Sequence, residues 1–292
     1  MYNRGPLLLI KNRSIQKNLT VVIRGVNERT EAQCKNLLVK QISKKNIHIV
    51  HKEPFRAALE ESYRIGIKAD RKWTMVIDAD VLICTGLISK LYSKAENAPN
   101  SVFVILTEMI DKFFGGKRVG GVKVYRTKLL PEALKIVPES DVRPEAFVIK
   151  NMHKKDFYVD IIDLICGLHD YEQYYSDIFR KGYVHGVKHA AFAKTLLSFW
   201  KRQASSDLDF AVLLAGYTAA SKHSGALQLA KDESRNHFTS YMKLSGIKEK
   251  DALDNDINVN SIIENLSPPP EYYEVKKEID KMGRPSVPKN AK

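Results

Sequence analysis

Short apolar runs alternate with segments of helical spacing in the first half of the chain. The runs that predict buried strands are residues 20–24, 47–50, 73–77 and 101–107. Helices are expected between them, beginning near Glu31 and at Pro54, where a proline suits the first helical turn. Strands and helices in alternation predict a mostly parallel sheet covered by helices, which is an α/β fold.

Strand signals thin out beyond about residue 140, and helical spacing replaces them. One apolar stripe at i, i+4, i+7 and i+8 is formed by Phe192, Leu196, Phe199 and Trp200. Beyond Asn255 the chain becomes polar. We therefore expect three parts in the chain. They are an α/β domain over residues 1–185, a helical extension over 186–255, and a polar, basic, partly disordered tail over 256–292.

A pair of aspartates ends the third expected strand, because Asp78-Ala79-Asp80 follows residues 73–77 directly. Ligands of open α/β sheets bind where the strands end. Two carboxylates one residue apart can serve a divalent cation, one directly and the other through water or a ribose, and Mg²⁺ and Mn²⁺ favour such oxygen ligands. The alternative is a solvated turn, since an isolated D-x-D pattern is common by chance.

The segments around this pair resemble family 2 glycosyltransferases. Residues 21–28, Val-Val-Ile-Arg-Gly-Val-Asn-Glu, look like the first strand and nucleotide-contacting turn of that family, and residues 64–80 are similar to its segment running into the D-x-D strand. The resemblance covers residues 18–127 and weakens beyond them. It implies a glycosyltransferase-A fold, which is Rossmann-like, with a mostly parallel sheet flanked by helices and here a helical C-terminal extension.

The same resemblance implies a hexosyltransferase that uses a nucleotide-diphosphate sugar as donor and a glycan or lipid-linked saccharide as acceptor. Mn²⁺ or Mg²⁺, held by Asp80 and Asp78, would bind the diphosphate. Arg24, Val26 and Glu28 would lie near the base and ribose of the donor. The second expected strand ends in His-Lys-Glu-Pro rather than the Asp-x-Ser that the family often shows there, so the base stays open.

Further donor contacts are implied for Arg64, which would face the donor site, and for Gly120 and Gly121, which are similar to a loop that borders the donor sugar in this fold class. Each has an ordinary alternative. Arg24 and Arg64 could be exposed charges on a strand end and a helix face. The two glycines could form a hairpin turn.

A catalytic base is needed if the reaction inverts the anomeric centre. Asp141 and Glu145 are the candidates, because fold relatives carry an acidic residue before a helix at about this distance after the glycine loop. Glu145 is preferred, since the apolar residues 146–149 would hold it rigidly. Inversion and retention both stay open.

His169 is a candidate for a further metal ligand. Metal-dependent members of this fold class often carry a histidine late in the domain that returns to the cation, and His169 follows the apolar residues 161–168. Asp170 or a backbone carbonyl could fix the tautomer of its imidazole. A histidine that caps a helix or packs in the core is the alternative.

The net charge of +13, from 47 basic and 34 acidic side chains, favours an anionic partner. A nucleotide diphosphate or an anionic membrane fits, whereas the lack of zinc-finger spacing and of long Lys/Arg runs argues against nucleic acid. Three widely spaced cysteines predict free thiols. The longest apolar stretches are too short to cross a bilayer, and residues 7–10 are too short for a signal-peptide core, so a cytoplasmic protein is expected.

Contact with the inner membrane face stays open. The stripe of residues 189–202 is bordered by lysines and Arg202, as in a helix that lies on anionic lipid, although internal packing explains such a stripe better. Two other functions also stay open. One is a sugar-nucleotide nucleotidyltransferase, which would need a glycine-rich phosphate loop where this chain has only Gly25. The other is a noncatalytic basic module that docks on membrane or nucleic acid.

Overall fold

The computed structural model describes residues 13–139, 143–188, 190–223, 230–253 and 257–281. The strands are β1 (Leu19–Gly25), β2 (Ile47–His51), β3 (Trp73–Asp78), β4 (Val81–Ile83), β5 (Val102–Asp111), β6 (Gly116–Arg126) and β7 (Tyr158–His169). They form one seven-stranded sheet in the order β2-β1-β3-β6-β5-β7-β4, in which β4 and β6 run against the others. The predicted α/β class with a mostly parallel sheet is confirmed.

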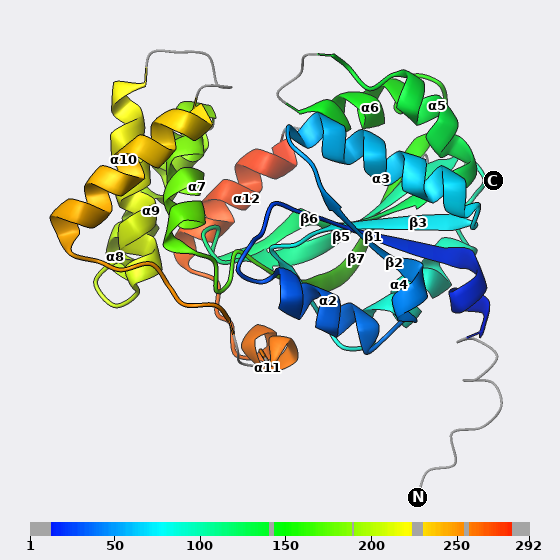
Figure 1. The fold of residues 1–292 in the computed structure, drawn as a ribbon, viewed down its shortest axis with the longest axis horizontal. Helices are drawn as coiled ribbons and strands as arrows, with labels where there is room; N and C mark the ends of the chain where they lie inside the picture. The colour runs from blue at the N-terminus through cyan, green and yellow to red at the C-terminus, as the bar shows by residue number, and fades with distance from the viewer. Residues whose placement is uncertain (1–12, 140–142, 189, 224–229, 254–256, 282–292) are drawn as a thin grey trace, which may run out of the picture.

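Helices cover both faces of the sheet, because successive side chains of a strand point to opposite faces. Val21 and Ile23 of β1 belong to one apolar cluster, and Val22 between them belongs to another. The first cluster is covered by α2 (Glu31–Val39) and α4 (Leu87–Glu96), and the second by α3 (Phe55–Ala69), α5 (Leu130–Lys135) and α6 (Pro144–His153) (Figure 1). Short 3-10 helices are η1 (Lys44–Asn46), η2 (Thr127–Leu129) and η3 (Ala220–Lys222).

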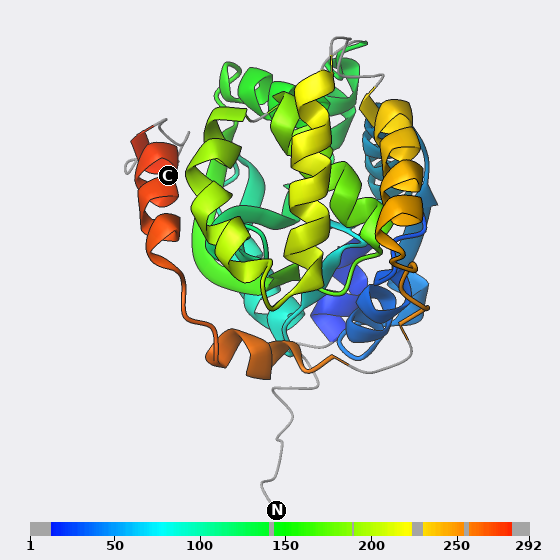
Figure 2. The ribbon, with the colours of Figure 1, turned by 90° about the vertical axis from the view of Figure 1, so that its left-hand side faces the viewer.

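A bundle of helices, which we call the helical module, follows the sheet and stands at one end of it (Figure 2). Its members are α7 (Tyr175–Lys188), α8 (Ala190–Gln203), α9 (Leu208–Ala219), α10 (Ala230–Ser245) and α12 (Pro270–Lys281). α7 and α9 approach each other very closely. A Cβ at Gly182 would lie 2.0 Å from the carbonyl oxygen of Leu213, and one at Gly216 would lie 2.1 Å from that of Phe179. Only glycine permits this contact.

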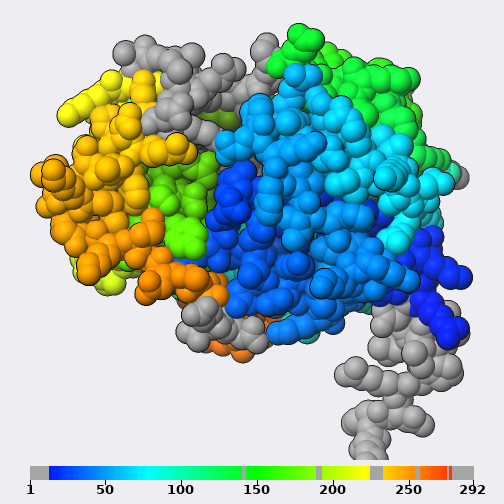
Figure 3. Space-filling model, viewed as in Figure 1, coloured from blue at the N-terminus to red at the C-terminus, as the bar shows by residue number. Residues whose placement is uncertain are grey.

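The hairpin between β5 and β6 joins the sheet to the helical module. Phe113 is buried among the helices, with its ring centroid 5.3 Å from that of Phe210, and its carbonyl accepts a hydrogen bond from Trp200 Nε1 at 2.7 Å. Next to it, Lys112 Nζ lies 2.6 Å from Asp209 Oδ2. The two parts also adjoin on the surface, where the orange and green atoms of the module meet the blue atoms of the N-terminal segments (Figure 3). The sheet and the module therefore form one continuous structure.

The apolar stripe predicted on residues 189–202 faces the inside of the module. Leu196, Phe199 and Trp200 are buried there, while the burial of Phe192 lies outside what is described. The membrane-docking hypothesis loses its basis, because its apolar face is already covered. Among the described residues, no helix combines the length and hydrophobicity needed to span a bilayer.

The expected domain limits differ from the observed elements at two places. α7 begins at Tyr175 and crosses the expected boundary after residue 185. The expected polar tail contributes α11 (Val259–Glu264), with Val259 packed near Leu82, and α12, where the Tyr272 hydroxyl donates to the carbonyl of Lys117 at 3.0 Å. Residues 257–281 are thus part of the fold, and the disorder predicted for the last residues falls on 282–292, outside the described residues.

Candidate functional site

Strand pairing brings the two halves of the site together. β3 ends at Asp78, the chain turns through Ala79 and Asp80, and β4 then pairs antiparallel with the end of β7, so that Val81 lies opposite His169. The backbone N–H of Asp170 donates to the carbonyl of Asp80 at 3.3 Å. The D-x-D segment and the His-Asp pair therefore meet at the end of the sheet.

Asp80, His169 and Asp170 form a cluster in which one ligand atom of each residue lies within 4.8 Å of the others. His169 Nε2 lies 3.3 Å from Asp80 Oδ2, and its Nδ1 lies 2.7 Å from Asp170 Oδ2. Burial alone would raise the pKa of Asp80, but His169, Lys181 and Arg118 together lower it. The other oxygen, Asp80 Oδ1, is buried and accepts no hydrogen bond from any described residue. A carboxylate held ionised with an unused oxygen suits a divalent cation.

Asp111 stands behind this cluster at the end of β5. One of its oxygens accepts the backbone N–H groups of Phe113 and Phe114, each at 3.0 Å, and the other lies 2.6 Å from Arg118 Nε and 2.9 Å from His169 Nδ1. Burial acts to raise the pKa of Asp111, but Arg118 and His169 hold it well below its usual range. His169 Nδ1 thus lies beside the carboxylates of Asp111 and Asp170 and 3.2 Å from Arg118 Nη2, while Nε2 faces Asp80.

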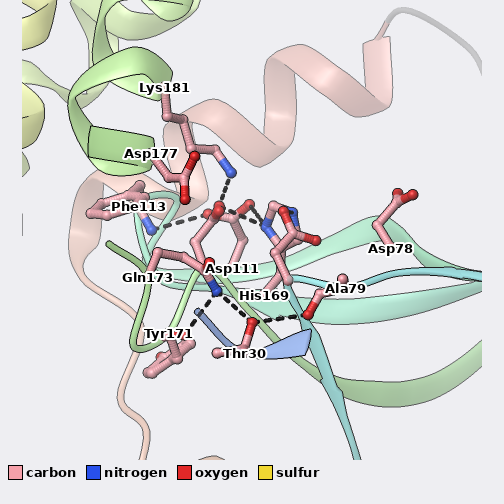
Figure 4. A network of polar contacts seen from close by, with 12 residues as sticks. Thr30, Asp78, Ala79, Asp111, Phe113, His169, Tyr171, Gln173, Asp177 and Lys181 are labelled. Carbon is pink, nitrogen blue, oxygen red and sulfur yellow. Dashed lines mark hydrogen bonds and ion pairs between the residues drawn. The ribbon is translucent and has the colours of Figure 1, made fainter. Parts of the chain in front are cut away.

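A cavity of about 730 Å³ opens in front of the cluster, between the sheet and α7. Its charged walls include Glu28, Asp80, Asp177, Arg118 and Lys181. Figure 4 shows the Lys181 side chain reaching from α7 to the carboxylates, where its Nζ forms an ion pair with Asp170. Burial lowers the pKa of Lys181 to about 8, against the opposing effect of Asp111 and Asp80.

The turn after β1 also borders the cavity. The backbone N–H of Val26 donates to Glu28 Oε2 at 2.6 Å, and burial raises the pKa of Glu28 to about 7. Thr30 fixes this turn to the D-x-D segment, because its hydroxyl donates to the carbonyl of Ala79 at 2.9 Å and accepts from Gln173 Nε2 at 2.9 Å. Glu28 therefore lines the cavity, and Val26 is bonded to it at the turn.

Asp78 has different partners from Asp80 and points away from the cluster (Figure 4). Its Oδ1 accepts a hydrogen bond from Arg24 Nε at 2.8 Å. Arg24 Nη1 in turn donates to Glu145 Oε1 at 3.1 Å, and the Arg24 guanidinium lies 4.7 Å from the ring centroid of Phe55. Burial acts against the charge of Arg24, but Asp78 and Glu145 outweigh it and raise its pKa. Asp78 is placed as the partner of Arg24 rather than as a member of the cluster.

Glu145 is buried, and its contacts do not suit a catalytic base. It accepts hydrogen bonds from Arg24 and from the Tyr125 hydroxyl at 2.7 Å, and its other oxygen lies 3.0 Å from Lys123 Nζ. Burial would raise the pKa of Glu145, but Arg24 and Lys123 lower it to about 2. Of the apolar residues 146–149, which were expected to hold Glu145, Phe147 is 39% exposed, and the contacts of Glu145 are with the ion-pair network instead. The other candidate, Asp141, lies outside the described residues.

Arg64 does not reach the site. It pairs with Glu60 at 2.9 Å on α3, and its side chain is 52% exposed. α3 begins near the site at Phe55, so a helical rise of about 1.5 Å per residue carries Arg64 roughly 13 Å away along the axis. The alternative of a solvated helix face explains this residue.

Gly120 and Gly121 lie inside β6, not in the hairpin turn, which residues 112–115 make instead. Both have positive φ, 141° and 80°, where the pairing of β5 with β6 shifts register. A Cβ at Gly121 would lie 2.8 Å from Cys166 Sγ. The glycines form a bulge, while the neighbouring Val119 borders the cavity.

Asp111 and Lys181 were missed by the sequence analysis. A signal for Asp111 existed, since it ends an apolar strand just as Asp78 does and precedes a Phe-Phe-Gly-Gly turn. For Lys181, which sits in a helix with several other basic residues, the sequence offers no such signal.

Comparison with known proteins gives no family for the chain, since no protein-family model and no curated protein matches it. Among solved structures, the chain is similar to a glycosyltransferase involved in glycosylation of the major capsid of PBCV-1, with 15% identity, a TM-score of 0.35, and coverage of 50% of this chain and 82% of that one. It is also similar to CMP:2-keto-3-deoxy-manno-octonic acid synthetase, with 9% identity, a TM-score of 0.36, and coverage of 51% and 90%.

A third structure is that of a putative glucose-1-phosphate thymidylyltransferase from Bacillus anthracis, with 8% identity, a TM-score of 0.36, and coverage of 51% and 87%. Similarities at this level assign neither family nor activity. The fold and site define a mixed α/β protein with a carboxylate–histidine cluster beside a deep cavity.

Proposed function

We propose that this chain is a metal-dependent glycosyltransferase that moves a sugar from a nucleotide-sugar donor to a glycan or lipid-linked saccharide acceptor. The observation that carries the proposal is the cluster of Asp80, His169 and Asp170 on the wall of a cavity of about 730 Å³. The resemblance of residues 18–127 to family 2 glycosyltransferases supports the reaction class and the donor class.

The donor set of the cluster fits Mn²⁺ or Mg²⁺. Asp80 and Asp170 offer carboxylate oxygens, and His169 offers a nitrogen that Mn²⁺ also accepts. The buried, unused Oδ1 of Asp80 is a ligand atom that no other described residue satisfies. When bound, such a cation neutralises the charge that develops on the departing diphosphate.

Arg24, Val26 and Glu28 are the proposed contacts of the base and ribose. Glu28 lines the cavity and Val26 is bonded to it through its backbone N–H, whereas Arg24 lies near the end of β1, buried beside Asp78. Asp78, which is 37% exposed beside Arg24, is proposed to contact the ribose from the same side. These roles leave the cluster itself to the metal and the diphosphate.

Asp177 replaces Glu145 in our proposal as the base that accepts the proton of the acceptor hydroxyl. It lines the cavity from the first turn of α7, across from Asp80, and burial raises its pKa, which its ion pair with Arg180 only partly offsets. A carboxylate with a raised pKa accepts a proton more readily than Glu145 does. Asp177→Asn should lower transfer by roughly a hundredfold or more while leaving Mn²⁺ affinity unchanged. An active Asp177→Asn variant would exclude this residue as the base.

A sugar-nucleotide nucleotidyltransferase would need a phosphate-binding turn after β1. At Gly25, an added Cβ would lie 2.6 Å from a carboxylate oxygen of Glu31 and 2.8 Å from one of Glu28. Two acidic side chains so close to the turn repel phosphate groups. We therefore prefer sugar transfer to nucleotidyl transfer.

The products of the reaction separate the two functions. Purified protein with Mn²⁺ should release a nucleoside diphosphate from one member of a panel of UDP-, GDP- and dTDP-sugars, and Asp80→Asn protein should not. Release of pyrophosphate from a nucleoside triphosphate and a sugar 1-phosphate would instead support the nucleotidyltransferase. Failure of the protein to bind or turn over any donor would overturn the proposal.

A further inference from the structure

Lys181 places an ammonium group inside the candidate cation site. Its Nζ forms an ion pair with Oδ2 of Asp170, which is one of the three candidate metal ligands. The side chain is only 22% exposed and reaches this position from α7, on the far side of the cavity (Figure 4). A cation of the protein itself therefore holds a place that a metal ion would use.

The carboxylates around Lys181 differ in how many hydrogen-bond donors and cationic groups they contact. Asp80, Asp111 and Asp170 bring three carboxylates, and Arg118 and Lys181 bring two cationic partners for them. Asp111 is satisfied without Lys181, because it accepts from Arg118 and from two backbone N–H groups. Asp170, in contrast, has only Lys181 and the imidazole of the cluster as charged partners among the described ion pairs.

A divalent cation and the ammonium group compete for the carboxylate of Asp170. Both are positive, and in a partly buried site like charges a few ångströms apart repel strongly. A metal ion that binds Asp80 and Asp170 must therefore displace the ammonium group or bind more weakly than the ligand set alone would allow. A displaced ammonium group would move into the cavity, which Lys181 itself lines.

The ammonium group cannot be displaced by a movement of the whole helix α7. Gly182, next in the chain, packs on the Leu213 carbonyl so closely that an added Cβ would be 2.0 Å from it, so α7 is fixed against α9. Only the flexible four-carbon stem of Lys181 can move. With a metal ion, Lys181 and Arg118 present, the positive charges outnumber the three carboxylates, and the cavity becomes a site for an anion.

We propose that Lys181 is a tethered cation that neutralises Asp170 in the metal-free protein and moves to the diphosphate of the nucleotide when a divalent ion displaces it. The inference rests on the proposed function, because it takes the nucleoside diphosphate as the anion. Lys181 then couples the binding of metal and nucleotide. It contacts the diphosphate directly, and its removal should change the two affinities in opposite directions.

Isothermal titration calorimetry with Mn²⁺ alone, and then with UDP, CDP, GDP and dTDP at saturating Mn²⁺, tests this coupling. Lys181→Met keeps the length of the side chain and removes its charge. We expect it to bind Mn²⁺ about tenfold more tightly and to bind the preferred nucleoside diphosphate about tenfold more weakly. Lys181→Arg should stay close to the wild type in both titrations. The matched control is Lys194→Met, which removes an exposed lysine of α8 and should change neither affinity.

Each outcome decides the proposal. Unchanged Mn²⁺ affinity in Lys181→Met, or a loss of both affinities with a lower melting temperature, would mean that the ion pair only stabilises the fold. Wild-type protein that binds Mn²⁺ but no nucleoside diphosphate would sink the proposed function, and tighter Mn²⁺ binding by Lys181→Met would then still establish the competition at Asp170.

Discussion

Asp78 and Asp80 are one residue apart in the sequence and have separate partners in the structure. Asp78 lies beside Arg24, whereas Asp80 lies beside His169. The difference follows from the pairing of β4 with β7, which turns the chain at Ala79 and directs the second carboxylate to the other side. The two aspartates should therefore differ in what their loss does.

Asp80→Asn should lower Mn²⁺ affinity and sugar transfer by at least about a hundredfold, because it removes a metal charge without changing the size of the side chain. Asp78→Asn is the matched variant and should keep Mn²⁺ affinity within a few-fold while weakening nucleotide binding. Calorimetry with Mn²⁺ alone and thermal melting of both variants check this. Equal losses of Mn²⁺ affinity would contradict the separation of roles.

Asp111→Asn should reduce Mn²⁺ affinity by roughly ten- to a hundredfold, although Asp111 is not itself a proposed ligand. Its carboxylate orients His169 through Nδ1 and anchors Arg118, and an amide would do this less well. Asp163→Asn, on the exposed part of β7 with a side chain 91% accessible, is the control. A wild-type affinity in Asp111→Asn would show that the imidazole needs no such support.

The sequence could predict those site residues that follow a recognisable strand and could not predict those that arrive from a distance. Asp80 belongs to the Asp78-Ala79-Asp80 segment that follows an apolar run, and His169 stands at the end of another. Asp177 and Lys181 reach the cavity only because α7 folds back across it, and no local pattern marks that path. Glu145 shows the converse. Its position in the sequence suits a catalytic base, but in the structure it forms ion pairs with Arg24 and Lys123.

At the scale of elements, the close crossing of α7 and α9 fixes the far wall of the cavity. Gly182→Ala should destabilise the protein by about 1–3 kcal/mol, because the added Cβ would lie 2.0 Å from a backbone carbonyl that cannot rotate away. For a chain of this size each kcal/mol lowers the melting temperature by roughly 2–4 °C.

Lys194→Ala, on the exposed side of α8, is the control and should melt within about a degree of the wild type. An unchanged melting temperature in Gly182→Ala would mean that the two helices can separate without cost. In that case the backbone beside Lys181 would not be fixed, and the coupling proposed for that lysine would lose one of its supports.

The helical stripe of residues 189–202 was recognisable from its spacing, but its partner was not. Leu196 and Trp200 face other helices of the same chain, and Trp200 also binds the hairpin that joins β5 to β6. An apolar stripe bordered by lysines describes a helix in a bundle as well as one on a membrane. Only the number and position of the neighbouring helices decide between them.

At the scale of the whole molecule, the alternation of strands and helices predicted the sheet, because each strand is a separate apolar run. The antiparallel strands β4 and β6 were harder to predict from the sequence, because β4 covers only three residues and β6 contains two glycines in a bulge. The sequence predicted a polar, basic, partly disordered tail, and the structure places α11 and α12 in it. Its buried residues Val259 and Tyr272 are too few to give a periodic signal. Val259 nevertheless packs near Leu82, and the Tyr272 hydroxyl donates to the carbonyl of Lys117.

Acid stability depends on the buried Glu145. Its pKa is lowered to about 2 in the folded protein, so its ion pairs stabilise the fold above the unfolded value of about 4.5, and this contribution is lost as the pH falls from about 4.5 to 2. Glu145→Gln should cost about 3 kcal/mol at pH 7, because Arg24 and Lys123 lose a buried partner.

The variant should also show a shallower fall of stability between pH 4.5 and pH 2 than the wild type. Urea unfolding across this range measures both effects. Glu274→Gln, an exposed substitution on α12, should follow the wild-type curve. Parallel curves for Glu145→Gln and wild type would show that Glu145 does not carry the acid sensitivity.

The pairing of β4 with β7 also determines when, during synthesis, the chain becomes able to bind a cation. Asp80 leaves the ribosome early, yet its partners lie beyond the first half of the chain, so no local folding event can assemble them. In a nascent chain that has already formed β1 to β3, Asp80 would still be exposed to solvent. Cation binding would begin only after β7 has emerged and paired with β4, which makes it a marker of late folding during synthesis.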